Sequence, residues 1–272
     1  MSDSLYENVA YKPAEVEHRY GANVHLLRDP HLLTLLAKLG SPETVQPDIN
    51  RLVRELYRLL SATVVAAEFT RRRVETPTRM ISSTPYGVYV GEVIDPSTRA
   101  VVVDIARAGT LPALVVYEHL NEVLEPRGVR QDHVVMSRTT DNDTGEVTGV
   151  TMSTSKVAGD AAGAMLLVPD PMGATGGSAC AAIDIYRRAG MQAPRKVILM
   201  NLIVTPQYLK KVALTHPEAV VYAVRLDRGL SAPDVLKTIP GERWSEENGL
   251  NELQYIVPGG GGFGEIMNNA YV

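Results

Sequence analysis

Residues 165–178 constrain the fold of this chain more strongly than any other segment. An apolar run ends there in an acidic residue, a short turn follows, and a helical pattern continues to Ala189; the letters read Met-Leu-Leu-Val-Pro-Asp-Pro-Met-Gly-Ala-Thr-Gly-Gly-Ser. This order predicts a strand, a tight loop and the start of a helix. The loop amides and the positive end of the helix dipole then converge on one point, which suits a phosphate group.

The residue types in this loop fit such a site. Gly176 and Gly177 carry no Cβ, so the backbone can approach an anion closely, and the hydroxyl groups of Thr175 and Ser178 add donors. Asp170, at the carboxyl end of the predicted strand, can accept hydrogen bonds from sugar hydroxyls. The sequence therefore predicts a site for a ribose 5-phosphate, with an ordinary strand-to-helix turn as the alternative.

The regions on either side alternate between strand and helix patterns. The expected strands cover residues 101–106, 133–137, 164–169, 196–204 and 219–226, and the expected helices cover 48–69, 111–124, 179–189 and 206–214. This alternation predicts a mostly parallel sheet with helices on both faces, and residues 145–155 read as a β-hairpin arm. Ligands of such sheets bind beyond the carboxyl ends of the strands, where Arg107, Arg138 and Asp170 would meet.

Three further features complete this organisation. Residues 1–23 are polar without clear periodicity and are expected to form an extended arm that packs on a neighbouring subunit. Asp48 is expected to cap the long helix, and the three arginines at 71–73 are expected to mark its solvated end, with anion binding as the alternative. Residues 229–250 combine Gly, Pro, Ser and charged residues, which indicates a surface insertion.

The composition narrows the function classes. With 272 residues, 45% hydrophobic content and a net charge of −4, the chain can bury one ordinary core, and it lacks the basic field typical of nucleic-acid binding. We see no 18-residue apolar run and no signal peptide, so we expect a cytoplasmic protein without membrane contact. The single cysteine, Cys180, is expected in the core, and the six histidines show no zinc-site spacing.

The loop from Asp170 to Ser178 resembles the 5-phosphoribosyl 1-pyrophosphate (PRPP) loop of the uracil phosphoribosyltransferases, in the single-acid form typical of that family. Residues 105–109 (Ile-Ala-Arg-Ala-Gly) are similar to the family's pyrophosphate loop, and residues 136–146 to its mobile lid. The resemblance implies that Arg107, Arg138 and Asp170 act in catalysis. It implies PRPP binding by these three residues and by Pro171, Met172, Gly173, Ala174, Thr175, Gly176, Gly177 and Ser178. Lys156 falls where the family often has a basic residue, with an ordinary surface lysine as an equal alternative.

Residues 255–265 resemble the family's uracil loop, in which backbone groups read the base. The resemblance implies base contacts at Ile256, Gly261, Gly262 and Phe263. Two positions depart from the family: Gly262 replaces an Asp that helps to bind PRPP, and Phe263 replaces a small Ala, so its ring would close or reshape the base pocket. Glu265 stands where the family has a second Asp and could partly substitute. A dinucleotide site is rejected, because too few residues follow these glycines for a helix and a second strand.

These features together predict an α/β domain over residues 24–272, type I phosphoribosyltransferase-like, with a mostly parallel central sheet, a small hood and a β-arm; residues 253–265 form its base loop. The resemblance implies transfer of the phosphoribosyl group of PRPP to uracil, giving UMP and pyrophosphate, with Mg²⁺ held mainly by PRPP and no metal site of the protein's own. It also implies a homodimer or higher oligomer, with a nucleotide effector left open. Two alternatives remain: a non-catalytic relative that senses PRPP or a nucleotide, and a phosphoribosyltransferase for another base.

Overall fold

The computed structural model describes residues 4–140, 147–188 and 190–270, and the side chains in these ranges except those of 137–140 and 147–152. Its centre is a sheet in the order β1-β10-β9-β7-β4-β5-β6, with the short β8 paired to β9. The strands are β1 Val24–Leu26, β4 Ala100–Ala106, β5 Val129–Thr140, β6 Val147–Lys156, β7 Met165–Pro169, β8 Met172–Gly173, β9 Lys196–Val204 and β10 Val220–Leu226. Neighbours run parallel except β5 and β6.

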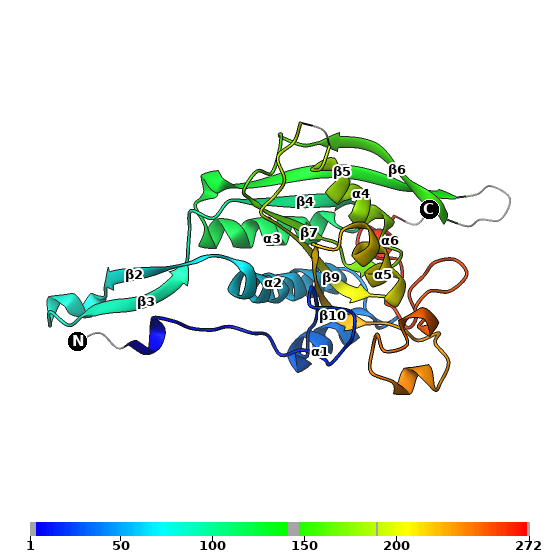
Figure 1. The fold of residues 1–272 in the computed structure, drawn as a ribbon, viewed down its shortest axis with the longest axis horizontal. Coiled ribbons are helices and arrows are strands. Elements are labelled where there is room, and N and C mark those ends of the chain that lie inside the picture. Colours follow the sequence, from blue (N-terminus) through cyan, green and yellow to red (C-terminus); the bar gives the residue numbers. More distant parts are fainter. Residues whose placement is uncertain (1–3, 141–146, 189, 271–272) are drawn as a thin grey trace.

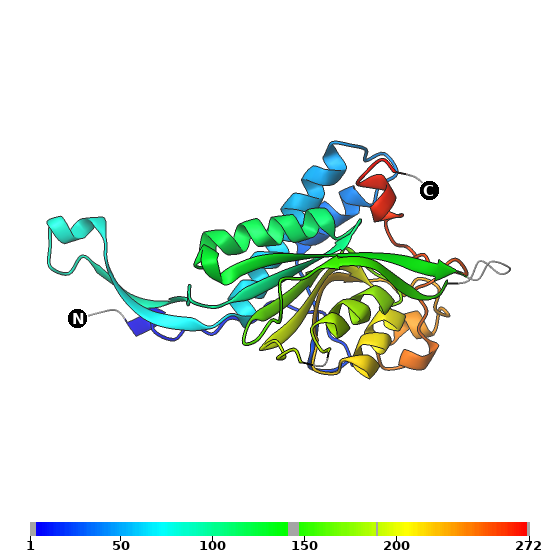
Figure 2. The ribbon, with the colours of Figure 1, turned by 90° about the horizontal axis from the view of Figure 1, so that it is seen from above.

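Helices cover both faces of this sheet (Figure 2). One face carries α1 Pro30–Leu39, α2 Asp48–Glu68 and α3 Thr110–Val123; the other carries α4 Gly177–Ile185 and α5 Pro206–Thr215. The central strands β7 and β9 are buried on both sides, as their continuous apolar runs predict. The predicted fold class, mixed α/β with a mostly parallel sheet flanked by helices, is confirmed.

A small hood lies over one end of the sheet. The C-terminal segment, with α6 Phe263–Ile266, packs on α1 and α2 through the buried side chains of Phe263 and Met267. Gln46 fixes it by donating from Nε2 to the carbonyl of Met267 at 3.0 Å. The predicted cap of α2 is wrong: Pro47 precedes the helix, and Asp48 is its first residue and accepts no capping hydrogen bond.

A second, two-stranded sheet projects from the body (Figure 1). It consists of β2 Arg71–Pro77 and β3 Val88–Ile94, joined through the 3-10 helix η2 Arg79–Ser82. The expectation that the arginines at 71–73 end a helix is therefore wrong. Helix α2 ends at Glu68, before these arginines, because Phe69 takes an extended backbone conformation with φ −84° and ψ 151°. The expected β-arm at 145–155 is confirmed as the β5–β6 pair, apart from residues 145–146, which lie outside the described residues.

The N-terminal segment packs on this chain's own β2–β3 hairpin. Its 3-10 helix η1 Ser4–Tyr6 contacts β3, and Glu7 lies 3.6 Å from Arg73.

Two helices differ from the sequence-based expectation. The sequence reading missed α1 although its start is marked by Asp29, whose carboxylate accepts from the amide of His31 at 2.8 Å, and by Pro30. α4 ends at Ile185, before Ala189, and the next residue, Tyr186, is fully buried.

The region 229–250 is held in place by a buried ion pair. It contains the 3-10 helices η4 Val235–Lys237 and η5 Trp244–Glu246; a third such helix, η3 Pro126–Gly128, precedes β5. The fully buried carboxylate of Glu247 pairs with Arg228 at 2.8 Å and accepts from the amide of Gly241 at 2.8 Å. The predicted surface insertion is thus a folded loop with its own buried ion pair.

Candidate functional site

The predicted phosphate loop lies at the carboxyl edge of the sheet, between β7 and α4. Asp170 follows β7 directly, and its amide donates to the carbonyl of Met200 in β9 at 3.0 Å. The next residues form β8, which pairs with β9, so the loop is attached to the neighbouring strand along its first half. Gly176 then precedes α4 with φ +85°, a left-handed conformation that glycine adopts without strain.

Four consecutive amide groups of the loop have no acceptor among the described residues, and we call them the open amides. None of the amides of Thr175, Gly176, Gly177 and Ser178 donates to a protein acceptor within the part of the chain that the structure describes. Two of them belong to the first turn of α4, where the helix dipole is positive. Thr175, Gly177 and Ser178 are partly exposed, whereas Gly176 is buried. The arrangement can bind an anion through the backbone alone.

The glycines of the loop have different roles. A Cβ on Gly176 would lie 3.1 Å from the side chain of Lys211 and 3.3 Å from the carbonyl of Tyr208, so it would press on α5. A Cβ on Gly173 would lie 2.9 Å from Val204 and 3.1 Å from the ring of Tyr208. Gly173 and Gly176 therefore let the loop lie flat on α5, whereas the sequence had suggested that Gly176 makes room for the anion itself.

Asp170 is half-buried at the base of the loop. Its carboxylate accepts from the amide of Met172 at 3.4 Å, and its carbonyl accepts from Asn201 Nδ2 at 2.7 Å. Burial, and secondly the charge of Asp170, raises the pKa of both Tyr57 and Tyr208 well above the ordinary value. The carboxylate thus lies within electrostatic reach of two buried phenols and stays at the edge of the sheet, where the sequence placed it.

Arg107 follows β4, the strand next to β7. Its exposed guanidinium donates from Nη1 to the carbonyl of Ala270 at 3.1 Å, which joins this loop to the C-terminal segment. A Cβ on Gly109 would lie 3.0 Å from the carbonyl of Pro169, so the Arg107 loop and the start of the phosphate loop are in contact. The peptide bond between Ala106 and Arg107 is cis. The Arg107 loop and the end of β7 that precedes Asp170 therefore lie at the same edge of the sheet, and the joint action of the two side chains stays a prediction.

Sequence reasoning missed a buried acid beneath the Arg107 loop. Asp104, only 4% exposed, accepts from Thr110 Oγ1 at 3.0 Å and pairs with His133 Nδ1 at 2.8 Å. These contacts join β4, the start of α3 and β5 on the side opposite α4. The sequence feature that could have indicated this buried acid is the presence of an acidic residue inside the apolar run of 101–106.

Arg138 lies within β5 rather than directly beyond a strand end. Ala106, the last residue of β4, pairs with Val135, so β5 carries Arg138 three residues past that edge. Its side chain lies outside the described part of the chain, as do residues 141–146 of the predicted lid. Lys156 ends β6, opposite His133. The parts of the predicted constellation that the structure brings together are thus Arg107 and the phosphate loop.

The predicted base loop is held by residues at the end of β10 and directly after it. Asp227, 2% exposed, accepts from the amide of Gly259 at 2.7 Å and from Arg225 Nε at 2.6 Å. Arg225 also donates to the carbonyl of Gly259 at 2.8 Å. Ile256 is buried, and Gly259 and Gly261 have positive φ. Nothing in the sequence near residues 225–227 marked this pair, because its partner lies 32 residues further along.

The structure shows the surroundings of Gly262 and Phe263, the two positions at which this loop departs from the family. Phe263 is 2% exposed, and its ring belongs to the core that α1 and α2 form with the sheet. A Cβ on Gly260 would lie 2.9 Å from this ring, so the ring packs against the base loop itself, and its closing or reshaping of a base pocket stays a prediction. A Cβ on Gly262 would collide with the carboxylate of Glu265. Glu265 therefore occupies the space in which a side chain at position 262 would begin. Backbone contacts of Ile256, Gly261, Gly262 and Phe263 to a base stay a prediction.

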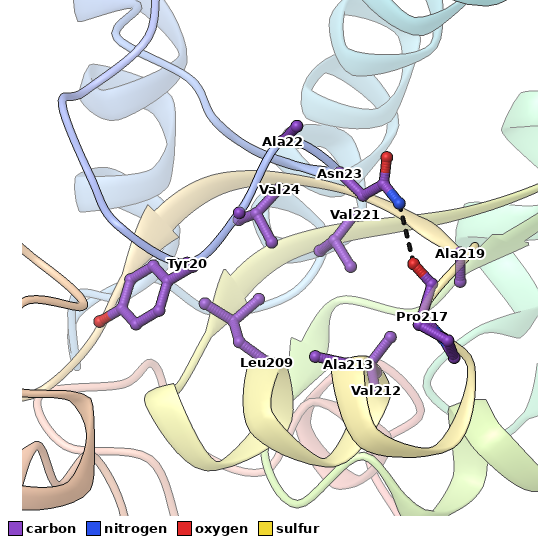
Figure 3. A pocket seen from close by; sticks show the side chains of 11 residues that line it. Tyr20, Ala22, Asn23, Val24, Leu209, Val212, Ala213, Pro217, Ala219 and Val221 are labelled. Carbon is purple, nitrogen blue, oxygen red and sulfur yellow. Dashed lines mark hydrogen bonds between the residues drawn. The ribbon is translucent and has the colours of Figure 1, made fainter.

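A pocket of about 230 Å³ between β1 and α5 has a different character (Figure 3). Small apolar side chains such as Val24 and Val212 line it, and Asn23 donates to the carbonyl of Pro217 at its rim at 2.8 Å. None of the predicted site residues lines it. Within the described residues, no cluster of three or more His, Cys, Asp or Glu could hold a metal ion, and no helix has the length and apolar character needed to cross a membrane.

A mostly parallel sheet, with a glycine-containing loop and a helix start at its carboxyl edge and an arginine after the neighbouring strand, defines an α/β protein with a candidate anion site at that edge. The model of the uracil phosphoribosyltransferase family matches residues 26–241, and the chain belongs to that family. The family resemblance read from the loops is thereby confirmed.

Individual relatives match over shorter segments. The uracil phosphoribosyltransferase of Thermoanaerobacter sp. (strain X514) is 38% identical over 112 residues, which cover 41% of this chain and 42% of the relative. That of Acinetobacter baylyi is 34% identical over 110 residues, or 40% and 41%. The matched segments thus span about two fifths of these relatives. The structure of the AQ2163 protein from Aquifex aeolicus aligns with a TM-score of 0.67 at 20% identity, over 92% of this chain and 99% of that one, and shares the fold.

Proposed function

We propose that this chain is an enzyme that transfers the phosphoribosyl group of PRPP to uracil, giving UMP and pyrophosphate. The observation that carries the proposal is the row of four open amides from Thr175 to Ser178, beside Asp170 and next to the Arg107 loop. This set of groups matches a sugar that bears a phosphate at one end and a pyrophosphate at the other. The family membership of residues 26–241 supports the same substrate class.

Each group has a defined task in the proposed reaction. The amides bind the 5-phosphate, Asp170 accepts hydrogen bonds from ribose hydroxyls, and Arg107 with Arg138 binds the pyrophosphate as planar, permanently charged donors. Uracil N1 forms a bond to C1 of the ribose while the bond from C1 to the pyrophosphate oxygen breaks, and the N1 proton leaves to solvent. Because positive charge develops on the ribose and negative charge on the leaving group, the protein contributes positioning and charge stabilisation.

Magnesium fits this site only as an ion that the substrate brings. Mg²⁺ is usually bound through one or two carboxylates together with substrate phosphates, and the described residues offer no larger cluster. Asp170 is the carboxylate at the phosphate-loop edge and Glu265 the one in the base loop. When bound, the ion would neutralise charge on the pyrophosphate and would be held mainly by oxygens of PRPP, with these carboxylates as the protein groups that could contact it.

Two other functions remain as alternatives: a relative that binds PRPP or a nucleotide as a sensor without turnover, and a phosphoribosyltransferase for another base. Calorimetric titration with PRPP and magnesium, followed by a uracil-to-UMP assay on the same sample, separates them. Binding with turnover supports the proposal, and binding without uracil turnover supports a sensor or another base. No binding of PRPP would contradict the proposal and a PRPP sensor, and would leave only a sensor of a nucleotide.

We also propose that the chain forms a homodimer or higher homo-oligomer, in which the β2–β3 hairpin contacts a second copy. The hairpin projects from the body and exposes large apolar side chains, including Tyr86 at 80% and Met80 at 56%. An apolar arm of this kind is stabilised when another surface covers it. Sedimentation of the wild type and of Tyr86→Ser tests the idea; a wild-type monomer at working concentration would contradict it.

A further inference from the structure

Thr205 lies directly beneath the phosphate loop, on a different element and more than 25 residues further along the chain. It follows β9, precedes the first residue of α5, and is fully buried at 0% exposure. No part of the loop motif includes it. A buried hydroxyl must find hydrogen-bond partners, so its partners show what it does.

All of these partners belong to the phosphate loop or to the start of α5. The backbone amide of Thr205 donates to the carbonyl of Gly173 at 3.1 Å. Its hydroxyl donates to the carbonyl of Ala174 at 2.6 Å and accepts from the amide of Tyr208 at 3.0 Å. One residue therefore holds two successive carbonyl groups of the loop and is itself fixed by the first turn of α5.

These bonds determine where the next amide points. The peptide group between Ala174 and Thr175 is planar and trans, so its carbonyl and its N–H point in opposite directions. Because the carbonyl of Ala174 is bound to Thr205 below the loop, the N–H of Thr175 points away from Thr205, toward the open side. This N–H is the first of the four open donors.

The surrounding contacts leave the loop little freedom to find another orientation. Gly173 packs against Val204 and the ring of Tyr208, and Asn201 Nδ2 holds the carbonyl of Asp170 at 2.7 Å. Gly249 lies against Thr205 from the other side, since a Cβ there would be 3.1 Å from Thr205 Cβ. Among the described residues, Thr205 is the only one whose side-chain hydroxyl binds a carbonyl next to the open amides.

We infer that Thr205 is a positioning residue for phosphate binding: its hydroxyl orients the Thr175 amide toward the 5-phosphate of the substrate. This inference rests on the proposed function of the loop. Thr205→Val keeps the shape of the side chain and removes the donor, so ribose 5-phosphate and PRPP should bind about tenfold more weakly, as expected for one lost hydrogen bond. Thr205→Ser keeps the hydroxyl and should restore binding to within about twofold of the wild type.

A matched control separates positioning from stability. Ser61 is also fully buried, and its hydroxyl is bonded to His119 Nδ1 at 2.7 Å, between α2 and α3. Ser61→Ala removes a buried hydroxyl away from the loop, so it should lower the Tm without changing the Kd for ribose 5-phosphate. Calorimetry on the full chain, at a temperature where every variant is folded, gives the Kd, and uracil KM should stay unchanged in Thr205→Val.

The outcomes distinguish the inference from the function on which it rests. If wild-type protein binds ribose 5-phosphate and Thr205→Val binds it equally well, the inference is wrong and the phosphate site stands. If wild-type protein binds neither ribose 5-phosphate nor PRPP, both are wrong. Should Thr205→Val not fold, titration of wild type with inorganic phosphate, followed by NMR, decides: the Thr175 amide resonance must shift, and an unmoved resonance overturns the inference.

Discussion

The phosphate loop and the base loop lie at the same edge of the sheet, but they are built in opposite ways. In the phosphate loop, residues close in sequence form the site, and the backbone itself presents its donors. In the base loop, residues far apart hold the chain: Asp227 and Arg225 bind Gly259, and Phe263 inserts into a core formed by helices near the N-terminus.

This difference explains why one loop could be interpreted residue by residue and the other could not. A strand end, a glycine pair and a helix start lie close together in the sequence, so the letters locate the amides of the site, although Thr205 from a distant segment holds the loop that carries them. The side chain at position 263 has no such local constraint. Whether it meets a ligand or the core depends on α1 and α2, which lie far away near the other end of the sequence.

The largest effect should come from the base loop, through packing. Phe263→Ala removes a ring that is 2% exposed, and the resulting cavity should destabilise the protein by about 3–5 kcal/mol. Phe263→Leu keeps most of the volume and should lose less than about 1.5 kcal/mol. Urea unfolding measures both. A small loss in Phe263→Ala would mean that the ring does not support the hood, and the contrast between the loops would fail.

The next effect belongs to the phosphate loop. Gly176→Val places a β-branched side chain at φ +85° and against Lys211 and Tyr208, so the open amides should lose their alignment and ribose 5-phosphate should bind about 100-fold more weakly. Gly159→Val is the matched control, because Gly159 has φ +101° with nothing within 4 Å of its Cβ position. Titration calorimetry compares them; equal affinity in Gly176→Val and wild type would remove the loop from the site.

Arg107 tests the link between the loops. Arg107→Lys retains the charge and removes the planar fork, so KM for PRPP should rise about tenfold. Arg99 lies at the opposite end of the same strand, is exposed and likewise donates to a backbone carbonyl, that of Ala162 at 3.3 Å. Steady-state kinetics of Arg107→Lys and Arg99→Lys should therefore differ in KM for PRPP, and identical values would place Arg107 outside the pyrophosphate site.

The whole fold shows the same difference between features set by nearby residues and features set by distant ones. The strands at 101–106, 164–169, 196–204 and 219–226 were predictable because buried parallel strands are continuous apolar runs. The β2–β3 hairpin was not predictable, since its first strand is largely exposed and begins with three arginines that also suit a helix end. The Asp104–His133 pair was not predictable either, because it depends on β4 and β5 becoming neighbours. The contacts of Asp227 and Arg225 with Gly259 were not predictable, because Gly259 lies more than 30 residues further along the chain.

The smallest effect is expected at Gly262, and it tests how rigid the base loop is. The backbone at Gly262, φ −81° and ψ 94°, suits any residue, so Gly262→Asp meets only the carboxylate of Glu265. That group is the flexible end of a partly exposed side chain and can move. Gly262→Asp should therefore lose less than about 1 kcal/mol of stability in urea unfolding, mostly from repulsion between two carboxylates.

The double variant Gly262→Asp with Glu265→Gln removes this repulsion and should return to wild-type stability. If position 262 needs a carboxylate for PRPP, the double variant should also turn over uracil faster than Glu265→Gln alone. A loss above about 2 kcal/mol in Gly262→Asp would exceed what a mobile surface group explains. Glu265 would then be fixed beside Gly262, and the base loop would be as locally determined as the phosphate loop.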